Sequence, residues 1–308
     1  MEVKQAVEEY SYAVLELSRG TQRWYAQKLA HFASWCEGQS LELEKIRPSD
    51  VRRYVDHLRS TINPRTGKPL SDYTVHGYAQ VVKGFLSFCS REDGLEDMVS
   101  ERTYKRIAMP HVEQKIIEVF TQEHIRKLLN ATQNEQNYGL EIRDRAIISV
   151  LLDSGVRASE LCGLTLSDVF IDTAEAYIRV KGKGRKEREV PLGRQARAIL
   201  HRYITRFRKA PRGEAHIFLS RSGRPLSPTG VDQMLYRLAH WARITDVRVS
   251  CHTFRHSFAV RYLEETGDIY KLSRLLGHTG VPVTEQYLRA VKARDVRREG
   301  ISVLDALQ

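Results

Sequence analysis

The sequence shows few features of a secreted or membrane-bound protein. Its four cysteines lie far apart in the chain, at Cys36, Cys89, Cys162 and Cys251. No pair of them has the spacing of a metal site or a redox motif. The longest strongly apolar run, residues 146–152, is far shorter than the roughly 18 residues that cross a bilayer. Residues 1–6 alternate in charge and contain no apolar signal core. We therefore expect a protein of a reducing, intracellular compartment, without disulfides or membrane segments.

Charge is distributed unevenly along the chain. Lys and Arg number 49 against 38 Asp and Glu, which gives a net charge of +11. Residues 1–110 hold 16 basic and 15 acidic side chains, whereas residues 111–308 hold 33 and 23. The basic excess predicts that a polyanion such as nucleic acid binds the C-terminal two-thirds. A solubilising charged surface would have the same composition and stays open as the alternative.

The first segment of the chain is predicted to be helical, because its apolar residues recur at helical spacing. Helices are expected over residues 3–17, from Thr21 as N-cap, from Pro48, and from Ser71 or Asp72 to about residue 90. Residues 63–69 are rich in turn-forming residues and are predicted to be a loop. We expect a small helical bundle over 1–107 and a linker over 108–117.

The second segment, residues 118–308, is predicted to mix helices with a few short strands. Helices are expected at 121–131, 140–154, 194–208, 228–243, 252–265 and 268–276. Strands at 176–180 and 187–191 flank a glycine-bearing turn, which indicates an antiparallel hairpin. Residues 216–220 are a further candidate strand. The expected fold class is mainly α with a small antiparallel β-sheet, a helical N-terminal domain preceding an α+β domain.

Four short segments carry side chains suited to phosphoryl transfer. They are S-G-V-R-A-S-E-L at 154–161, the turn with Lys183, H-T-F-R-H at 252–256, and L-G-H at 276–278 with Tyr287 nine residues later. Arg157 and Arg255 each offer a guanidinium fork, so together they can clamp one phosphodiester and neutralise its charge. Lys183 can protonate a leaving oxygen. Tyr287 can attack the phosphorus and form a covalent phosphotyrosine.

A tyrosine nucleophile requires help to lose its proton at neutral pH. Its ordinary pKa is near 10, so a base or a hydrogen-bond partner must lie beside the Tyr287 hydroxyl. His252 and His278 are available for that function.

Each of these residues taken alone has a simpler interpretation. Arg157 can form a surface ion pair, Lys183 can be one solvated charge among several, and Tyr287 can belong to a helix core. His252 and His256 can form half of a zinc site, although the motif contains no acidic residue to act as base. The order and spacing of all the segments favour the catalytic interpretation.

With these residues in this order, the sequence resembles the tyrosine site-specific recombinases of the phage integrase family. The motifs that carry the resemblance are R-x-x-E-L, the G-K-G turn, H-x-x-R-H, L-G-H and the tyrosine that follows. The resemblance covers nearly the whole chain and implies a core-binding, DNA-clamping domain over 1–107 and a catalytic domain over 118–308. Leu288 and Arg289 after the tyrosine, and Arg261 in place of a common histidine, depart from the family pattern outside the catalytic positions.

The resemblance implies a role for each matching residue. The implied catalytic residues are Arg157, Lys183, His252, Arg255, His278 and the nucleophile Tyr287, with Glu160 and His256 in support. Tyr287 would form a 3′-phosphotyrosyl link and release a 5′-hydroxyl, which Lys183 would protonate. His252 would transfer protons, and His278 would hydrogen-bond the phosphate. Because the phosphotyrosyl bond conserves the energy of the phosphodiester, no cofactor, ATP or metal ion is expected.

The implied partner is double-stranded DNA with specific inverted-repeat core sites, contacted mostly through its phosphates. Additional DNA contacts are expected from Lys181, Arg185, Gln233, Arg237 and His240. The resemblance implies pairwise strand exchange through a Holliday junction, for integration, excision or resolution of a mobile element or replicon. The synapse would be a homotetramer, or a heterotetramer with a related recombinase.

Protomers of that synapse would contact one another through the tail, residues 290–308, and the alternative is a tail that packs on its own domain. The absence of an additional arm-binding domain favours a simple, Xer-like architecture. The implied location is the cytoplasm, in association with the nucleoid.

Three other functions stay open on the sequence alone. The first is a non-catalytic DNA-binding protein, which would not need a complete catalytic set with a nucleophile. The second is a metal-dependent nuclease that uses the histidines, which activity in EDTA would distinguish. The third is a topoisomerase that relaxes DNA without exchanging partners, which strict dependence on two specific sites would exclude.

Overall fold

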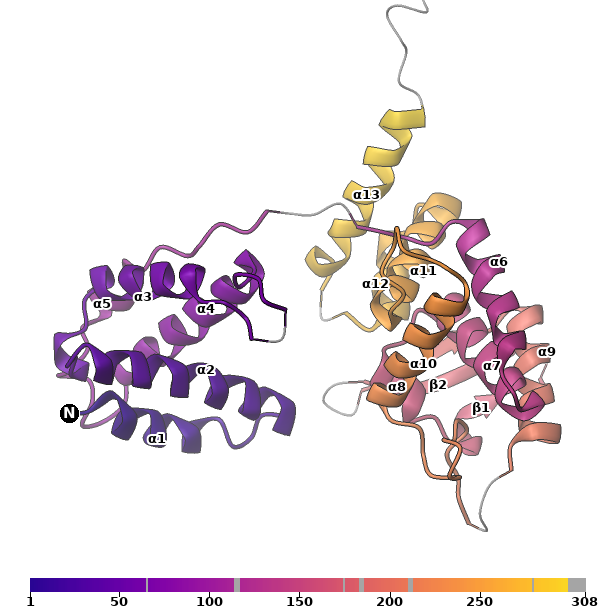
Figure 1. Ribbon diagram of the computed structural model, residues 1–308, viewed down its shortest axis with the longest axis horizontal. Helices are drawn as coiled ribbons and strands as arrows, with labels where there is room; N and C mark the ends of the chain where they lie inside the picture. Colours follow the sequence, from indigo (N-terminus) through magenta and orange to yellow (C-terminus); the bar gives the residue numbers. More distant parts are fainter. Residues whose placement is uncertain are drawn as a thin grey trace, which may run out of the picture. The chain divides into compact units, whose positions relative to one another are not determined.

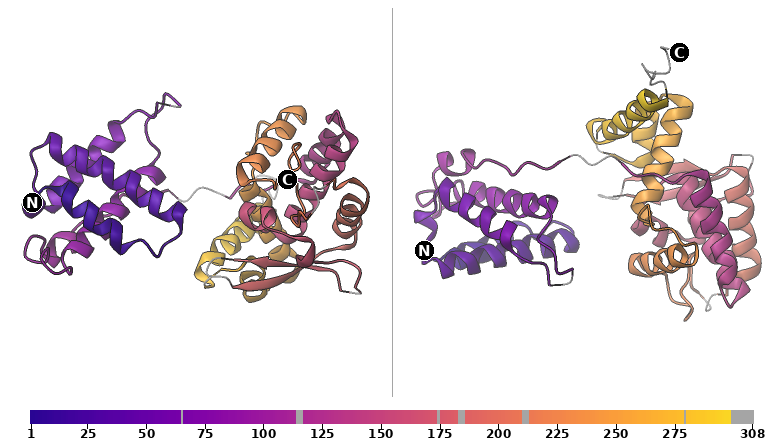
Figure 2. Two further views of the ribbon diagram at one scale, coloured as in Figure 1. Left: turned by 90° about the horizontal axis from the view of Figure 1, so that it is seen from below. Right: turned by 45° about the horizontal axis from the view of Figure 1, so that its top comes forward.

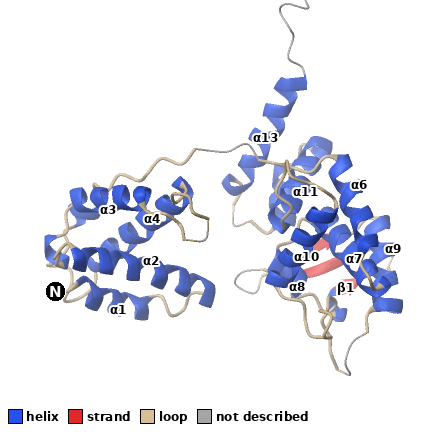
Figure 3. Ribbon diagram, in the orientation of Figure 1, coloured by secondary structure: helices blue, strands red, loops and turns tan. Residues whose placement is uncertain are grey.

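The computed structural model describes residues 1–64, 66–113, 117–173, 175–182, 186–209, 213–278 and 280–298, with side chains described up to residue 291. The chain divides into two compact units, residues 1–115 and 116–308. Helices predominate in both, and the strands of the described part all lie in the second unit (Figure 3). The predicted fold class, mainly α with a small antiparallel sheet, is confirmed.

The N-terminal unit is a helical bundle around one apolar core (Figure 1). Its described helices are α1 (Val3–Ala13), α2 (Arg19–Gly38), α3 (Pro48–Ser60), α4 (Asp72–Cys89) and α5 (Glu101–Lys105). Phe32, Tyr54 and Phe85 are fully buried at the centre, and each aromatic ring contributes on the order of 2–3 kcal/mol of burial free energy. Two boundaries differ from the sequence prediction. The first helix ends at Ala13. The N-cap of α2 is Ser18, because its Oγ accepts a hydrogen bond from the backbone N–H of Thr21.

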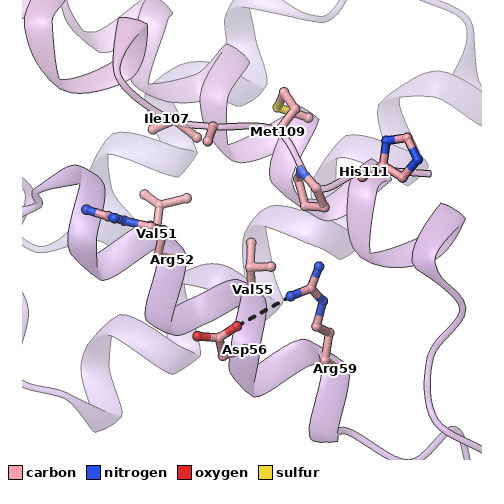
Figure 4. Close-up of a pocket in the computed structure, with 10 residues that line it drawn as sticks. Val51, Arg52, Val55, Asp56, Arg59, Ile107, Met109 and His111 are labelled. Carbon is pink, nitrogen blue, oxygen red and sulfur yellow. Dashed lines mark ion pairs between the residues drawn. The ribbon is translucent and has the colours of Figure 1, made fainter. Parts of the chain in front are cut away.

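A cavity of about 290 Å³ lies beside α3 in this unit (Figure 4). Its labelled lining residues are Val51, Arg52, Val55, Asp56, Arg59, Ile107, Met109 and His111. The ion pair between Asp56 and Arg59 spans 3.7 Å, and both side chains are more than half exposed, so it contributes little to stability. Its lining residues all belong to the N-terminal unit.

The C-terminal unit combines helices with a three-stranded sheet. Its described helices are α6 (Gln122–Ala131), α7 (Tyr138–Ser154), α8 (Ala158–Cys162), α9 (Arg194–Arg202), α10 (Pro228–Trp241), α11 (Cys251–Thr266), α12 (Ile269–Leu276) and α13 (Pro282–Arg298). α7 and α12 pack against strand β3 (Glu187–Pro191), and α8 packs against β2 (Tyr177–Lys181). Figure 2 shows the sheet along one edge of this unit. None of the described helices has both the length and the apolar character needed to cross a membrane.

The sheet contains the predicted hairpin. Strands β1 (Val169–Phe170), β2 and β3 are antiparallel and lie in that order. In β2 the buried side chains of Ile178 and Val180 alternate with less buried ones, so one face of the strand covers the core. Residues 216–220 are not a strand, because His216 and Leu219 make only isolated bridges. The sequence prediction also omitted the short strand β1 and the helix α13.

Gly155 ends α7 and directs the chain into α8. Its backbone adopts the left-handed conformation, with φ of 60°, and its N–H bonds to the Leu151 carbonyl. A Cβ at this position would lie 2.4 Å from Phe258 Cδ1 and 3.1 Å from Leu276 Cδ2. Both the backbone conformation and the close packing therefore require glycine here.

Substituting alanine for Gly155 is expected to lower the free energy of unfolding by about 2–5 kcal/mol. The left-handed backbone contributes roughly 1–2 kcal/mol and the overpacking roughly 1–3 kcal/mol. Urea unfolding of both variants measures the effect. Gly84→Ala is the matched control, because nothing lies within 4 Å of its Cβ position in α4, and it is expected to stabilise by up to about 1 kcal/mol. Equal unfolding midpoints for the Gly155 variant and the wild type would contradict this account.

Candidate active site

Five of the six predicted catalytic residues lie in the described part of the C-terminal unit, each beside or within a helix. Arg157 precedes α8, His252 and Arg255 lie on α11, His278 follows α12, and Tyr287 lies on α13. Hydrogen bonds and ring contacts connect them into one cluster. Lys183 and Arg185 lie outside the described residues, as do residues 299–308 of the tail.

The two predicted phosphate-binding arginines are held by backbone carbonyls at the ends of two helices. Arg255 is 3% exposed and donates to the Gly155 carbonyl at 2.9 Å and to the Leu276 carbonyl at 2.8 Å. Arg157 donates to the same Leu276 carbonyl at 3.5 Å. Carbonyls at helix C-termini carry partial negative charge and favour cations. Burial, together with Arg157, lowers the pKa of Arg255 to about 10, so its guanidinium stays charged at neutral pH.

A buried carboxylate and a third arginine complete the cluster. Glu160 accepts hydrogen bonds from the Arg157 backbone N–H and Nη1, both at 2.9 Å, and from Arg188 Nη1 and Nη2 at 2.9 and 2.8 Å. Arg188 Nε also donates to the Leu275 carbonyl at 2.6 Å. Burial raises the pKa of Glu160, but the hydrogen bonds and charges of the two arginines outweigh this effect and hold that pKa below its usual range.

Arg188 is the residue of this cluster that the sequence analysis missed. It lies on β3 two residues before the fully buried Val190, so the two side chains share the inner face of the strand. A charged residue on the core-facing side of a predicted strand is the signal that could have identified it.

Gly277 in the L-G-H motif serves both as a helix cap and as space for Arg188. It has a φ of 64° and ends α12, with its N–H bonded to the carbonyls of the preceding turn. A Cβ at this position would lie 2.8 Å from Arg188 Nη1. The missing side chain therefore lets the guanidinium reach the end of the helix.

His278 is oriented through both of its ring nitrogens. Nε2 lies 2.9 Å from Arg255 Nη2, and Nδ1 lies 2.7 Å from Thr284 Oγ1, whose side chain is buried. Burial and the positive charge of Arg255 lower the pKa of His278 to about 4, so the ring is neutral at pH 7. Because a guanidinium can only donate, Nε2 must accept, and we assign the proton to Nδ1, which donates to Thr284.

The Tyr287 hydroxyl is engaged by a histidine other than the two expected. Tyr287 is 2% exposed, and its Oη lies 3.1 Å from His256 Nδ1. The His278 ring lies parallel to the tyrosine ring at a centroid distance of 6.4 Å. Burial raises the pKa of Tyr287, and the adjacent Arg255 opposes that rise. No hydrogen bond among the described residues joins the hydroxyl to His252.

The zinc-site alternative requires a third ligand beside His252 and His256. Within the described ranges, no three His, Cys, Asp or Glu side chains are grouped so that they could hold a metal ion. The two histidine rings lie edge to face, with centroids 4.7 Å apart. The arrangement therefore gives this alternative no support.

The predicted DNA-contacting residues have different surroundings. Gln233 and His240 are exposed on α10, whereas Arg237 donates to Glu135 and, at 3.1 Å, to the buried Asp144. These ion pairs hold Arg237 beside Glu135 and Asp144, and its contact with DNA stays a prediction. Lys181 is largely exposed and lies 3.7 Å from a carboxylate oxygen of Asp168.

Comparison with known proteins shows the family of this chain. The model of the phage integrase family matches residues 118–294. The chain belongs to the phage integrase family. It is 30% identical over 288 residues to the tyrosine recombinase XerD of Halalkalibacterium halodurans, an alignment that covers 87% of this chain and 93% of the relative. It is also 30% identical over 290 residues to XerC of Anoxybacillus flavithermus, with 92% and 91% coverage.

Solved structures share the fold of this recombinase. The XerH recombinase in its post-cleavage complex with palindromic difH substrate matches with a TM-score of 0.77 at 20% identity, over 96% of this chain and 83% of that chain. The Tn1549 transposon integrase with transposon right end DNA matches with a TM-score of 0.73 at 16% identity, over 98% and 100%. The predicted activity, site-specific recombination by an enzyme that cleaves and rejoins DNA through a tyrosine, is confirmed by the family and its Xer members.

Proposed function

We propose that this recombinase cleaves DNA in the site built around Tyr287 and exchanges strands between two specific DNA sites. The observation that carries the proposal is the hydrogen-bonded cluster formed within one chain. In that cluster Arg255 contacts His278, and both lie beside the Tyr287 side chain. A nucleophile beside two arginines is what a phosphodiester needs in order to react without a cofactor.

The reaction divides into charge neutralisation and proton transfer. Arg157 and Arg255 bind the non-bridging oxygens and neutralise the charge that develops on the phosphorane. The Tyr287 oxygen forms a bond to the phosphorus as the bond to the 5′-oxygen breaks, which leaves a 3′-phosphotyrosyl link. Lys183 protonates the departing 5′-oxygen, and His252 takes part in proton transfer. His278 hydrogen-bonds the phosphate, and for this its Nε2 exchanges the Arg255 contact for the substrate and carries the ring proton. Glu160 and His256 support this set.

Double-stranded DNA with inverted-repeat core sites is the proposed substrate. The basic excess of residues 111–308, and the exposed side of α10 with Gln233, Tyr236 and His240, support contacts from the C-terminal unit. The DNA bound in the XerH and Tn1549 integrase structures supports the same substrate class. We assign residues 1–107 as the core-binding domain and 118–308 as the catalytic domain. Affinity should decrease steeply with salt, because most contacts are to phosphates.

Strand exchange is proposed to take place between protomers of a tetramer in the cytoplasm. The 5′-hydroxyl of a partner strand attacks the phosphotyrosyl bond, so exchange proceeds pairwise through a Holliday junction. A lambda integrase dimer on its core site shares the fold, with a TM-score of 0.69. The tail, residues 290–308, is proposed to contact a neighbouring protomer. Integration, excision or resolution of a mobile element or replicon would result.

Covalent trapping tests this function directly. The wild-type protein is incubated in EDTA with nicked suicide duplexes made from inverted repeats in the DNA that flanks its gene. We expect a protein–DNA adduct on a denaturing gel, and mass spectrometry of the digested adduct should place the nucleotide on the Tyr287 peptide. Metal-dependent cleavage that leaves free ends would instead indicate a nuclease. Binding to a validated site without any adduct would indicate a protein that only binds DNA.

A further inference from the structure

The Tyr287 hydroxyl has a specific hydrogen-bond partner on the neighbouring helix α11. His256 Nδ1 lies 3.1 Å from Tyr287 Oη, and the two ring centroids are 5.5 Å apart. Both side chains are at least partly buried, so water competes little for this bond. A general base must lie within hydrogen-bond reach of the proton that it removes, and this distance satisfies that condition.

The direction of this hydrogen bond follows from the other neighbour of the hydroxyl. The positively charged Arg255 lies beside Tyr287 and opposes the rise in the pKa of its hydroxyl, and a guanidinium has donors but no acceptor. The phenolic oxygen therefore keeps a lone pair towards that positive charge, and its own proton is directed to His256 Nδ1, 3.1 Å away. His256 then carries its ring proton on Nε2 and presents a lone pair to the nucleophile.

We propose that His256 is the general base that accepts the Tyr287 proton during strand cleavage. This inference rests on the proposed function, in which Tyr287 is the nucleophile. As the Oη–P bond forms, the Oη–H bond breaks and its proton moves to Nδ1, which makes His256 an imidazolium. The P–O5′ bond breaks with its electron pair on O5′, and the acid on the opposite side protonates that oxygen. In the ligation step, the imidazolium returns its proton to the departing tyrosine oxygen.

The electrostatic surroundings keep His256 ready to accept a proton. Burial, His252 and Arg255 together lower the pKa of His256 to about 4, so the ring is neutral at pH 7. A phosphodiester held between Arg157 and Arg255 brings a negative charge that offsets the positive charges opposing protonation. The base therefore gains proton affinity when substrate is bound.

The other two histidines are less well placed for this step. Both ring nitrogens of His278 already have partners, Arg255 and Thr284. The His252 side chain is exposed and lies with its ring edge to face with His256, and in the described part of the chain it makes no hydrogen bond with the hydroxyl. His252 thus stays available for the scissile phosphate and the leaving group.

A leaving-group substitution separates the base from the acid. Single-turnover cleavage is measured with the wild type, His256→Asn and Lys183→Ala on two suicide substrates, one with oxygen and one with sulfur at the 5′-bridging position. A thiolate leaves without protonation, because the pKa of a thiol lies far below that of an alcohol. On the oxygen substrate, we expect His256→Asn to be slower than wild type by about 10²–10³-fold. We expect sulfur to restore Lys183→Ala and leave His256→Asn slow.

Several outcomes would overturn the assignment of His256. Cleavage of the oxygen substrate by His256→Asn within threefold of the wild-type rate would do so. Full recovery of the wild-type rate by His256→Asn on the sulfur substrate would also do so, because it would show that His256 protonates the leaving group. His201→Asn, an exposed histidine on α9, is the matched control and should cleave at the wild-type rate. Thermal unfolding and DNA binding are measured for each variant, and His256→Gln replaces the Asn variant if that variant does not fold. If the wild type forms its adduct at Tyr287 and the His256 variant cleaves at the wild-type rate, only this inference is refuted. If the wild-type adduct forms at another residue, the proposed function is refuted.

Discussion

Phenylalanine in place of Tyr287 is expected to abolish the covalent protein–DNA adduct and to leave DNA affinity within about twofold of the wild type. The substitution removes one hydroxyl group and retains a ring that is 2% exposed in the described structure. Without the nucleophile, the cleavage rate should decrease by at least about 10⁴-fold. The measurement is a denaturing gel with suicide DNA in EDTA, alongside a binding titration on the same duplex. An adduct of wild-type yield in the variant would show that another residue attacks the phosphate.

The same variant also tests whether the tyrosine acts in its own chain. Tyr287 lies beside Arg255 and His256 of one chain in this structure, so we expect cleavage in cis. A mixture of Tyr287→Phe with an Arg255→Gln variant therefore should form no adduct. Cleavage in trans would restore activity in the mixture, because each intact group could complete the other protomer's site.

Alanine in place of Glu160 is expected to lower the free energy of unfolding by about 3 kcal/mol, because it leaves the largely buried guanidinium of Arg188 without its counterion, whereas the more exposed Arg157 stays in contact with water. The carboxylate accepts four hydrogen bonds from Arg157 and Arg188. Its loss should also release Arg157 from its orientation and slow cleavage by about 10²-fold. Urea unfolding and single-turnover cleavage measure the two effects. Glu123→Gln, at an exposed ion pair on α6, is the control and should change stability by less than about 1 kcal/mol.

A second substitution shows whether the loss of stability in Glu160→Ala comes from the unpaired charge of Arg188. If it does, Arg188→Met added to Glu160→Ala should recover part of the stability, because one uncompensated guanidinium is removed. Strictly additive effects of the two substitutions would contradict that explanation.

The contribution of Glu160 should also depend on pH. Because its folded-state pKa is depressed, the carboxylate contributes fully above its unfolded value of about 4.3, and that contribution is lost as the pH falls through the folded pKa. The difference in unfolding free energy between wild type and Glu160→Gln should therefore shrink from neutral pH to about pH 3. A difference that stays constant over this range would show that the charge of Glu160 does not stabilise the fold.

The elements of this fold that depend on nearby residues could be predicted from the sequence. Apolar spacing located most helices, and the glycine-bearing turn between two short strands located the hairpin. The C-terminal ends of α7 at Gly155 and of α12 at Gly277 also follow from the local sequence, because glycine adopts a positive φ at little energetic cost. The N-cap of α2 was predicted at Thr21 but lies at Ser18, because serine and threonine can both cap a helix and the two residues lie only three positions apart.

The sequence by itself determined the family and the reaction type and predicted the set of reactive side chains, since motif order and residue chemistry are properties of the chain. Only the tertiary structure decided which atoms meet. Arg188 and Glu160 are 28 residues apart, His256 and Tyr287 are 31 apart, and Arg237 and Asp144 are 93 apart. Periodicity assigns each side chain to a face of its own helix or strand, but the packing of distant elements sets which side chains come within hydrogen-bonding distance. For that reason the contact of His256 with the Tyr287 hydroxyl and the pairing of Arg188 with Glu160 emerged only from the folded chain.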